Sequence, residues 1–185
     1  MTIYFSSDHH FLHRNILKYD HRPFASIEEH DAELVRRWNK KVKPEDTVYY
    51  LGDFCFSSIE RCLNLKNQLN GNKMILIKGN HDGSVTRMKK IFNEVYKTLI
   101  IDFHGRKVRL SHYPYTDNPE RGPQNDGMWL LHGHTHSKGH KVHDKQINVG
   151  VVFWDYYPVS EYEILSIMNK VETPSWWKRI LRRLK

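Results

Sequence analysis

Short apolar runs recur along the chain, and amphipathic stretches or polar loops separate them. The runs contain many β-branched and aromatic residues, a composition that favours strands. They predict strands at residues 2–6, 47–51, 73–78, 98–103, 107–111, 128–132 and 145–149. His104-Gly105 stands between the fourth and fifth of these runs and is typical of a tight hairpin turn. We therefore expect those two strands to pair antiparallel within a mixed sheet arrangement.

Helix signals alternate with the strand signals. Ser26 and Glu29 have the spacing of a capping box ahead of an amphipathic segment, and Ser160 and Glu163 have the same spacing further on. Helices are predicted at residues 27–42, 58–70, 84–92 and 160–170. The alternation of the two kinds of element predicts an α/β layered domain.

Candidate metal ligands follow five of the apolar runs. The five segments are Ser7-Asp8-His9-His10, Leu51-Gly52-Asp53, Lys78-Gly79-Asn80-His81-Asp82, Ser111-His112-Tyr113-Pro114 and His132-Gly133-His134-Thr135-His136. An α/β fold builds its site at the ends of its strands. Each segment alone would fit ordinary turn chemistry, because Asp and Asn are favoured in turns. All five together predict one polynuclear metal centre.

The ligand types narrow the choice of metal. Carboxylate, amide and imidazole ligands suit Mn, Fe, Zn or Co and argue against a thiolate site. Two aspartates, one asparagine and four histidines are too many for one ion that also holds a water. They suffice for two ions that share a bridging carboxylate. Two ions about 3.5–4 Å apart can hold the attacking and leaving oxygens of a displacement at phosphorus.

The five segments resemble the motifs of the calcineurin-like metallophosphoesterase superfamily, which read D-x-H, G-D, G-N-H-[DE], H and G-H-x-H. The match spans residues 8 to 136, and the chain is similar to the small single-domain prokaryotic or phage-type members. The resemblance implies an α/β fold of two facing mixed β-sheets flanked by helices, a four-layer αββα sandwich. The second motif continues as Phe54-Cys55 and lacks the V-D-R-G of protein serine/threonine phosphatases, so that activity is not expected.

The resemblance also implies a role for each motif residue. The first metal would be held by Asp8, His10 and His136, the second by Asn80, His112 and His134, and Asp53 would bridge the two. His81 would contact the phosphate and protonate the leaving group, and Asp82 would orient His81. Imidazolium suits proton donation near neutral pH, and a neighbouring carboxylate keeps it charged.

These roles predict a dinuclear-metal-dependent phosphoesterase in which a hydroxide that bridges the ions attacks phosphorus. We expect Mn, with Fe, Zn, Ni or Co as alternatives. A phosphodiester of a nucleotide or nucleic acid is favoured, because no cap domain is evident, the net charge is positive and a protonating His81 helps a poor alkoxide leaving group. The alternatives are a phosphomonoesterase acting on small phosphorylated metabolites and a non-catalytic binding scaffold.

Further residues near the motifs are candidates for substrate binding, with a solvated or structural role as the alternative for each. They are His13, Arg14, Asn15, Arg22 and Tyr113. The two arginines could bind phosphate. The tyrosine could stack on a nucleobase.

Composition and charge add two expectations. With 185 residues, 39% of them hydrophobic, the chain suits one globular domain, predicted over residues 1–172. Its two cysteines are expected to be free thiols, and we expect a cytoplasmic enzyme without a leader segment. The formal net charge is +8, but the last twelve residues carry five cations and no acids, which leaves only +3 on the other 173. Residues 173–185 thus form a basic amphipathic tail that could contact nucleic acid, an anionic membrane or a dimer mate.

Overall fold

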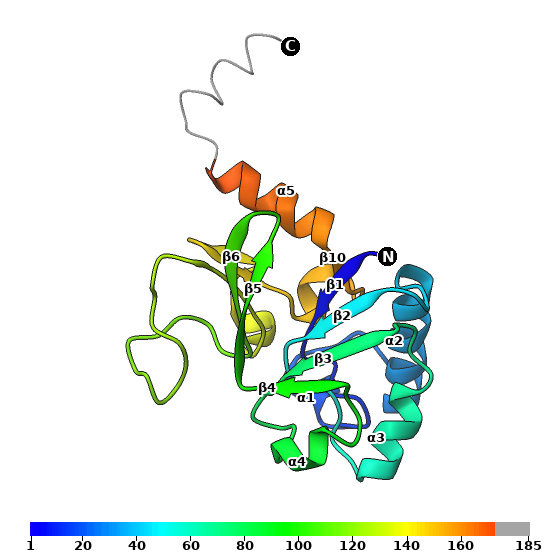
Figure 1. Cartoon of the computed structure of the whole chain (residues 1–185). Coiled ribbons are helices and arrows are strands. Elements are labelled where there is room, and N and C mark those ends of the chain that lie inside the picture. Colours follow the sequence, from blue (N-terminus) through cyan, green and yellow to red (C-terminus); the bar gives the residue numbers. More distant parts are fainter. Residues whose placement is uncertain (173–185) are drawn as a thin grey trace, which may run out of the picture.

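Two five-stranded sheets organise the protein in a computed structural model that describes residues 1–172 (Figure 1). The strand order of the first sheet is β10-β1-β2-β3-β4. Its strands are β1 (Ile3–Ser6), β2 (Thr47–Tyr50), β3 (Lys73–Ile77), β4 (Glu94–Tyr96) and β10 (Val159–Ser160). The first four run parallel and β10 is antiparallel to β1, so this sheet is mixed. The predicted tail, residues 173–185, lies outside the described residues.

The second sheet is also mixed and has the order β5-β6-β7-β9-β8. Its strands are β5 (Thr98–Phe103), β6 (Arg106–Ser111), β7 (Trp129–His132), β8 (Val142–His143) and β9 (Gln146–Asn148). Strands β6, β7 and β9 run parallel, while β5 and β8 are antiparallel to their neighbours. The predicted hairpin is confirmed: Phe103 pairs with Arg106, and His104 and Gly105 both have positive φ, as a type I′ turn requires.

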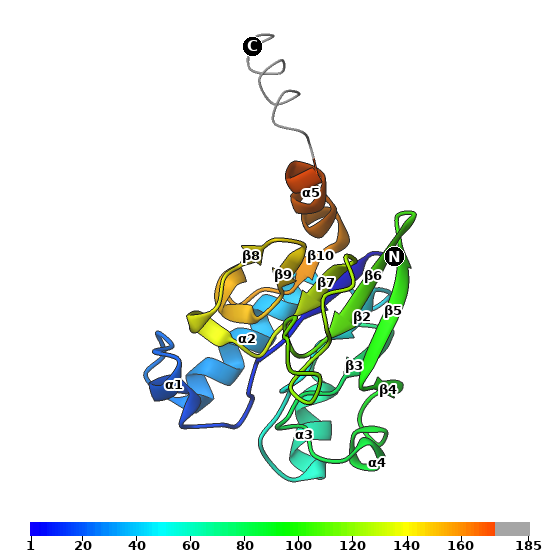
Figure 2. The same cartoon turned by 90° about the vertical axis from the view of Figure 1, so that its left-hand side faces the viewer.

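The helices are α1 (Ile16–Tyr19), α2 (Ile27–Lys41), α3 (Ile59–Lys66), α4 (Val85–Met88) and α5 (Glu161–Glu172), with short 3-10 turns at η1 (His136–Lys138) and η2 (Val151–Trp154). Helices α2 and α3 lie along the outer side of the first sheet. In Figure 1 and Figure 2, α5 lies at the top of the molecule and α4 at the bottom. Among residues 1–172, every helix is too short or too polar to cross a lipid bilayer.

Two apolar cores follow from the alternation of side chains along the strands. Tyr50 and Leu76 belong to the core between the first sheet and helices α2 and α3, which includes Trp38. Their neighbours Ile75 and Ile77 belong to the second core, which holds residues of both sheets and of α5. The expectation of two facing mixed sheets flanked by helices is therefore confirmed. Both cysteines are buried and free, as expected.

Some elements differ from their predicted bounds. The seven predicted strands are present, and β4, β8, β10 and α1 are additional short elements. The helix predicted at residues 84–92 ends at Met88, and its remaining residues lead into β4 through Ile91 and Phe92, which are buried in the first core. Ser26 and Ser58 cap α2 and α3 as their sequences predict, each accepting a backbone N–H.

Candidate metal centre

The five motif segments converge because they leave parallel strands at the same ends of the two sheets. The segments follow β1, β2, β3, β6 and β7. Within the first sheet, the amide of Asp8 donates to the carbonyl of Gly52 over 3.0 Å, and that of His10 donates to Asp53 over 3.1 Å. Within the second, the Gly133 amide donates to the carbonyl of His112 over 3.0 Å. These bonds fix the loops relative to one another.

One cluster of ligand atoms comes from Asp8, His10, Asp53 and His136, whose candidate atoms all lie within 4.8 Å of one another. Nε2 of His10 is 3.2 Å from Nε2 of His136 and 3.5 Å from Oδ2 of Asp53. Asp8 and Asp53 are each only 1% exposed. Two carboxylates and two imidazoles in this arrangement can hold a divalent ion.

A second cluster of candidate ligand atoms lies beside the first and shares Asp53 with it. Nε2 of His112 lies 3.4 Å from Asp53 Oδ2, 3.1 Å from Asn80 Oδ1 and 3.2 Å from His134 Nδ1. The same carboxylate oxygen of Asp53 therefore faces His10 on one side and His112 on the other. All seven residues predicted as ligands from the sequence are brought together here.

The protonation of these groups suits a cation. Burial lowers the pKa of His10 to about 2 and that of His134 to about 4, so both imidazoles are neutral and offer lone pairs. Burial also opposes charge on His112, but its contacts with Asp53 and the charge of Asp8 raise its pKa to about 9. A proton thus holds His112 against Asp53 without metal, and a divalent ion would take its place. The donor set fits hard or borderline divalent ions.

An uncommon backbone conformation recurs among the candidate ligands. Positive φ occurs at Asp8 (59°), His10 (52°), Asp53 (59°), His134 (70°) and His136 (47°), five of the seven candidate ligands. Positive φ is uncommon for residues with a side chain, and strained residues of this kind cluster at functional sites. At these five positions the turn of the backbone helps to aim the ligand atoms at one another, although six other residues with side chains also have positive φ among residues 1–172.

Two glycines permit the close approach of the loops. A Cβ at Gly52 would overlap Nδ1 of His112 and the backbone of Gly79, and φ at Gly52 is +95°. A Cβ at Gly133 would overlap the side chains of Ser7 and Asp8. Any larger residue at either position would displace a candidate ligand.

A buried carboxylate that the sequence analysis missed supports His136. Asp20 is 6% exposed, and its Oδ2 lies 3.2 Å from Nδ1 of His136. Its Oδ1 accepts from the amide and the hydroxyl of Ser137, at 3.1 and 2.7 Å. Burial opposes its charge, but the bonds to His136 and Ser137 outweigh burial and lower the pKa of Asp20. Asp20 thus holds a proton on Nδ1 and leaves Nε2 free to bind a metal. His112 is oriented in the same way by the carbonyl of Leu51, 2.8 Å from its Nδ1.

Arg22, a predicted substrate contact, lies beneath the first motif. It is 4% exposed, and its guanidinium donates to the carbonyls of Asp8 and His9 over 2.7 Å each. It also pairs with Asp20 at 3.2 Å. With these donors occupied inside the protein, Arg22 holds the strained loop in shape, and we expect it to contact no phosphate.

His81 and Asp82 are separated, contrary to the predicted pairing of their side chains. His81 is exposed, and its ring centroid lies 5.3 Å from that of His10. Asp82 is 2% exposed, and its oxygens accept the backbone amides of Gly79, Asp53 and Phe54 at 2.7 to 2.9 Å. The prediction that Asp82 orients the His81 ring is therefore wrong. Asp82 instead ties the second and third motifs together, and the His81 amide donates to Asp53 Oδ1 over 2.9 Å.

The remaining predicted substrate contacts divide into two pairs. His13 lines a pocket of about 330 Å³ together with His10, His81 and His136, and Tyr113 packs its ring 4.7 Å from that of His134. Arg14 has an 82% exposed side chain, faces Glu28 at 3.9 Å and lines a different pocket. Asn15 is exposed just ahead of α1. The structure thus brings His13 and Tyr113 to the centre, whereas Arg14 and Asn15 lie outside it.

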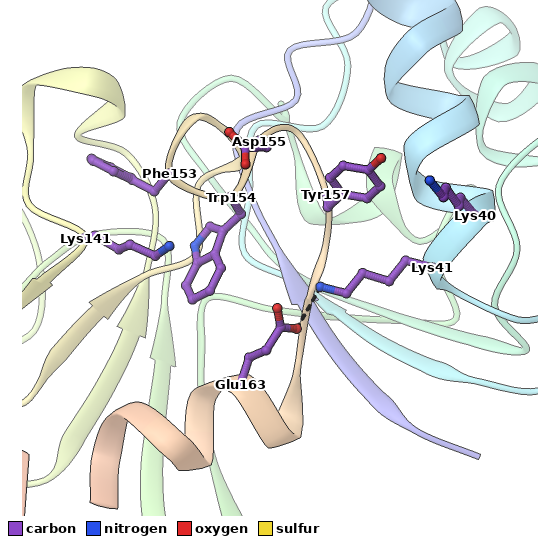
Figure 3. A pocket seen from close by; sticks show the side chains of 8 residues that line it. All are labelled: Lys40, Lys41, Lys141, Phe153, Trp154, Asp155, Tyr157 and Glu163. Atoms are coloured by element: carbon purple, nitrogen blue, oxygen red, sulfur yellow. Dashed lines mark hydrogen bonds and ion pairs between the residues drawn. The ribbon is translucent and has the colours of Figure 1, made fainter. Parts of the chain in front are cut away.

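A larger hollow of about 490 Å³ lies elsewhere, between the end of α2, the η2 turn and the start of α5 (Figure 3). In it Lys41 pairs with Glu163 at 2.7 Å, and the ammonium of Lys141 lies 3.7 Å from the centroid of the Trp154 ring. Its charged groups are of both signs, and none of its lining residues is a candidate ligand. This hollow is therefore separate from the candidate metal centre.

Comparison with known proteins finds a family profile and relatives of similar length. The profile of the calcineurin-like phosphoesterase superfamily domain matches residues 1–167. An uncharacterized protein of Methanocaldococcus jannaschii is 36% identical over 179 residues, which cover 91% of this chain and 92% of that one. The gene 66 protein of Mycobacterium phage L5 is 32% identical over 199 residues, covering 91% and 94%. A crystal structure of a protein of unknown function from Aquifex aeolicus is 31% identical, covers 90% of this chain and 98% of that one, and superposes with a TM-score of 0.73.

Proposed function

Because the chain belongs to the calcineurin-like phosphoesterase superfamily, we propose that it is a metal-dependent phosphodiesterase that uses two divalent ions and acts on a nucleotide or nucleic-acid diester. The observation that carries this proposal is the position of Asp53. Its Oδ2 lies 3.5 Å from Nε2 of His10 and 3.4 Å from Nε2 of His112, between the two groups of ligand atoms. A carboxylate so placed can bridge two ions.

The residues divide between the ions as follows. Asp8, His10 and His136 would hold the first, Asn80, His112 and His134 would hold the second, and Asp53 would serve both. When bound, two such ions lower the pKa of a water and neutralise charge on a phosphate. We propose Mn²⁺ as the ion, with Fe, Zn, Ni or Co as alternatives for the same donor set.

His81 acts at the leaving group. Its exposed ring lines the pocket beside the ring of His10, its amide donates to Asp53, and Asp82 accepts the amide of Gly79 in the same motif. As the bond between phosphorus and the departing oxygen breaks, the ring gives that oxygen a proton. The attacking water forms the new bond to phosphorus, leaves its hydroxyl on the product phosphate and releases its other proton to solvent. An alkoxide is a poor leaving group, so this proton matters most for alkyl diesters.

The test compares bis-p-nitrophenyl phosphate with p-nitrophenyl phosphate on metal-stripped protein to which Mn²⁺ is added back. We expect the diester to be hydrolysed faster and only with metal. Faster hydrolysis of the monoester would indicate that the substrate is a small phosphorylated metabolite. Inactivity with Mn²⁺, and also with Fe, Zn, Ni or Co ions added in its place, would indicate a binding scaffold and contradict the proposal.

A further inference from the structure

An exposed row of aromatic rings borders the pocket beside His81. Tyr19 is 67% exposed and Phe56 is 52% exposed, and His13 lies between them. The ring centroids of His13 and Phe56 are 4.6 Å apart, and those of Phe56 and His81 are 6.0 Å apart. His13 and Tyr19 line the pocket of about 330 Å³ that His10 and His81 also line. The row formed by Tyr19, His13 and Phe56 is called the aromatic platform below.

Backbone hydrogen bonds fix the loop that carries Phe56. The amide of Phe56 donates to the carbonyl of Phe11 over 2.9 Å, and the amide of Phe11 donates to Phe54 over 2.9 Å. The next carbonyl, that of Ser57, accepts from the Arg87 guanidinium. Phe54, two residues before Phe56, is 1% exposed in the first core, whereas Phe56 is left in solvent by the same fixed loop. The exposure of Phe56 is therefore set by the fold and does not result from a loose loop.

His13 is held in the same manner from the first motif. Its amide donates to the carbonyl of His10 over 3.1 Å, and its own carbonyl accepts from Ile16 over 2.9 Å. The ring of His13 lies 5.6 Å from that of His10, a candidate metal ligand. The rings of His13 and Phe56, inclined at 35° to each other, thus lie beside the place where the phosphate would bind.

We propose that the aromatic platform stacks the nucleobase on the leaving-group side of the substrate, an inference that rests on the proposed phosphodiesterase function. Every nucleobase has an aromatic face, and fixed aromatic side chains bind such faces with little regard to sequence. Because the platform adjoins His81, the base it holds belongs to the nucleoside that leaves. Lys138, which lines the same pocket, supplies a positive charge for the phosphate.

The first experiment measures binding and does not depend on turnover. The probes are the non-hydrolysable phosphonate analogues of adenosine 5′-monophosphate and of ribose 5-phosphate, titrated into the Mn²⁺-loaded protein by calorimetry. We expect the ribose analogue, which lacks the base, to bind roughly 5- to 150-fold more weakly. A ratio near one in the wild type, or binding of neither analogue, would overturn the proposal.

Matched variants separate stacking from simple apolar contact. Phe56→Leu keeps apolar area but removes the ring, so the ratio should fall several-fold, and Phe56→Trp should preserve it. Tyr162→Leu is the control, because Tyr162 is 62% exposed on α5, a helix that contributes no residue to the pocket, whereas Phe56 packs against His13, which lines it. An unchanged ratio in Phe56→Leu would overturn the proposal. So would a dimer that Phe56→Leu dissociates, which would make the platform a contact between copies of the chain.

Hydrolysis of bis-p-nitrophenyl phosphate by the same samples distinguishes the two proposals. An inactive wild type that still prefers the adenosine analogue would contradict the proposed function and leave the platform standing. An active wild type that binds the two analogues equally would support the proposed function and contradict the role of the platform.

Discussion

Asp20→Asn should weaken metal binding without removing a ligand. Oδ2 of Asp20 lies 3.2 Å from Nδ1 of His136 and 3.2 Å from Nε of Arg22. In the variant an amide NH₂ takes the place of that oxygen, since the remaining carbonyl oxygen is needed by Ser137. Nδ1 of His136 must then accept a hydrogen bond, and the ring proton moves to Nε2. Nε2 is the atom that faces His10 at 3.2 Å, so a proton there blocks the bond to a metal.

The size of the effect follows from what each contact contributes. Loss of the group that orients a ligating histidine typically lowers metal affinity by roughly 10- to 100-fold, or about 1.4–2.7 kcal/mol. The metal-free protein should also lose about 1–3 kcal/mol of unfolding free energy, because the buried Arg22 then faces a donor instead of a carboxylate. Ser137→Ala removes one hydroxyl bond and leaves the carboxylate in place, so its effect on metal affinity should be far smaller.

Competition between the metal-stripped protein and a fluorescent chelator measures Mn²⁺ affinity, and urea unfolding without metal measures stability. Asp102→Asn serves as the matched control, because Asp102 is an exposed aspartate that pairs only with Lys107 in the described interactions. An affinity for Asp20→Asn within about threefold of the wild type would refute the argument that Asp20 sets the tautomer of His136.

Three further substitutions test the rest of the centre. Asp53→Asn should abolish diester hydrolysis and lower the metal content of dialysed protein, because the shared ligand is lost; full activity would contradict the bridging role. His81→Ala should keep its metal but lose turnover by roughly 10²- to 10⁴-fold, with a smaller loss on aryl than on alkyl esters, and equal losses would show that His81 only positions the phosphate. Gly133→Ala should lose metal, because its Cβ would overlap Ser7 and Asp8. Gly127→Ala, whose Cβ would meet nothing within 4 Å, should keep its metal. Equal metal content in the two variants would contradict the close-packing argument.

The convergence of the candidate ligands could be predicted because each one follows a strand that the apolar pattern reveals. Asp53 comes three positions after the end of β2, and His112 directly follows β6. Parallel strands bring such residues to the same edge of a fold wherever they stand in the chain. The His104-Gly105 turn was predictable for a similar reason, because its conformation is decided by the two residues themselves.

Asp20 could not be predicted because its role depends on contacts far along the chain. Its partners His136 and Ser137 are separated from it by 116 and 117 positions. The role expected of Asp82 was wrong for the converse reason. Adjacency to His81 in sequence does not aim the two side chains at each other, and the Asp82 carboxylate turns to backbone amides of the two motif loops.

Burial of charged groups was equally invisible in the sequence. Arg22 stands close to the first motif, as a phosphate ligand would, yet it is 4% exposed and holds the carbonyls of Asp8 and His9. Short elements such as α1 and β4 were not predicted, because a few residues cannot establish a hydrophobic period of either 3.6 or 2 residues. Tertiary contacts decide these features, and local patterns do not record them.

The number of Mn²⁺ ions at which activity saturates tests the central claim most directly. Metal-stripped protein is titrated with Mn²⁺ while bound metal and hydrolysis of bis-p-nitrophenyl phosphate are followed in the same samples. Asp53 lies between two groups of ligand atoms, so we predict that hydrolysis rises to its maximum at two ions per chain. Saturation at one ion per chain, or hydrolysis without added metal, would contradict the dinuclear centre.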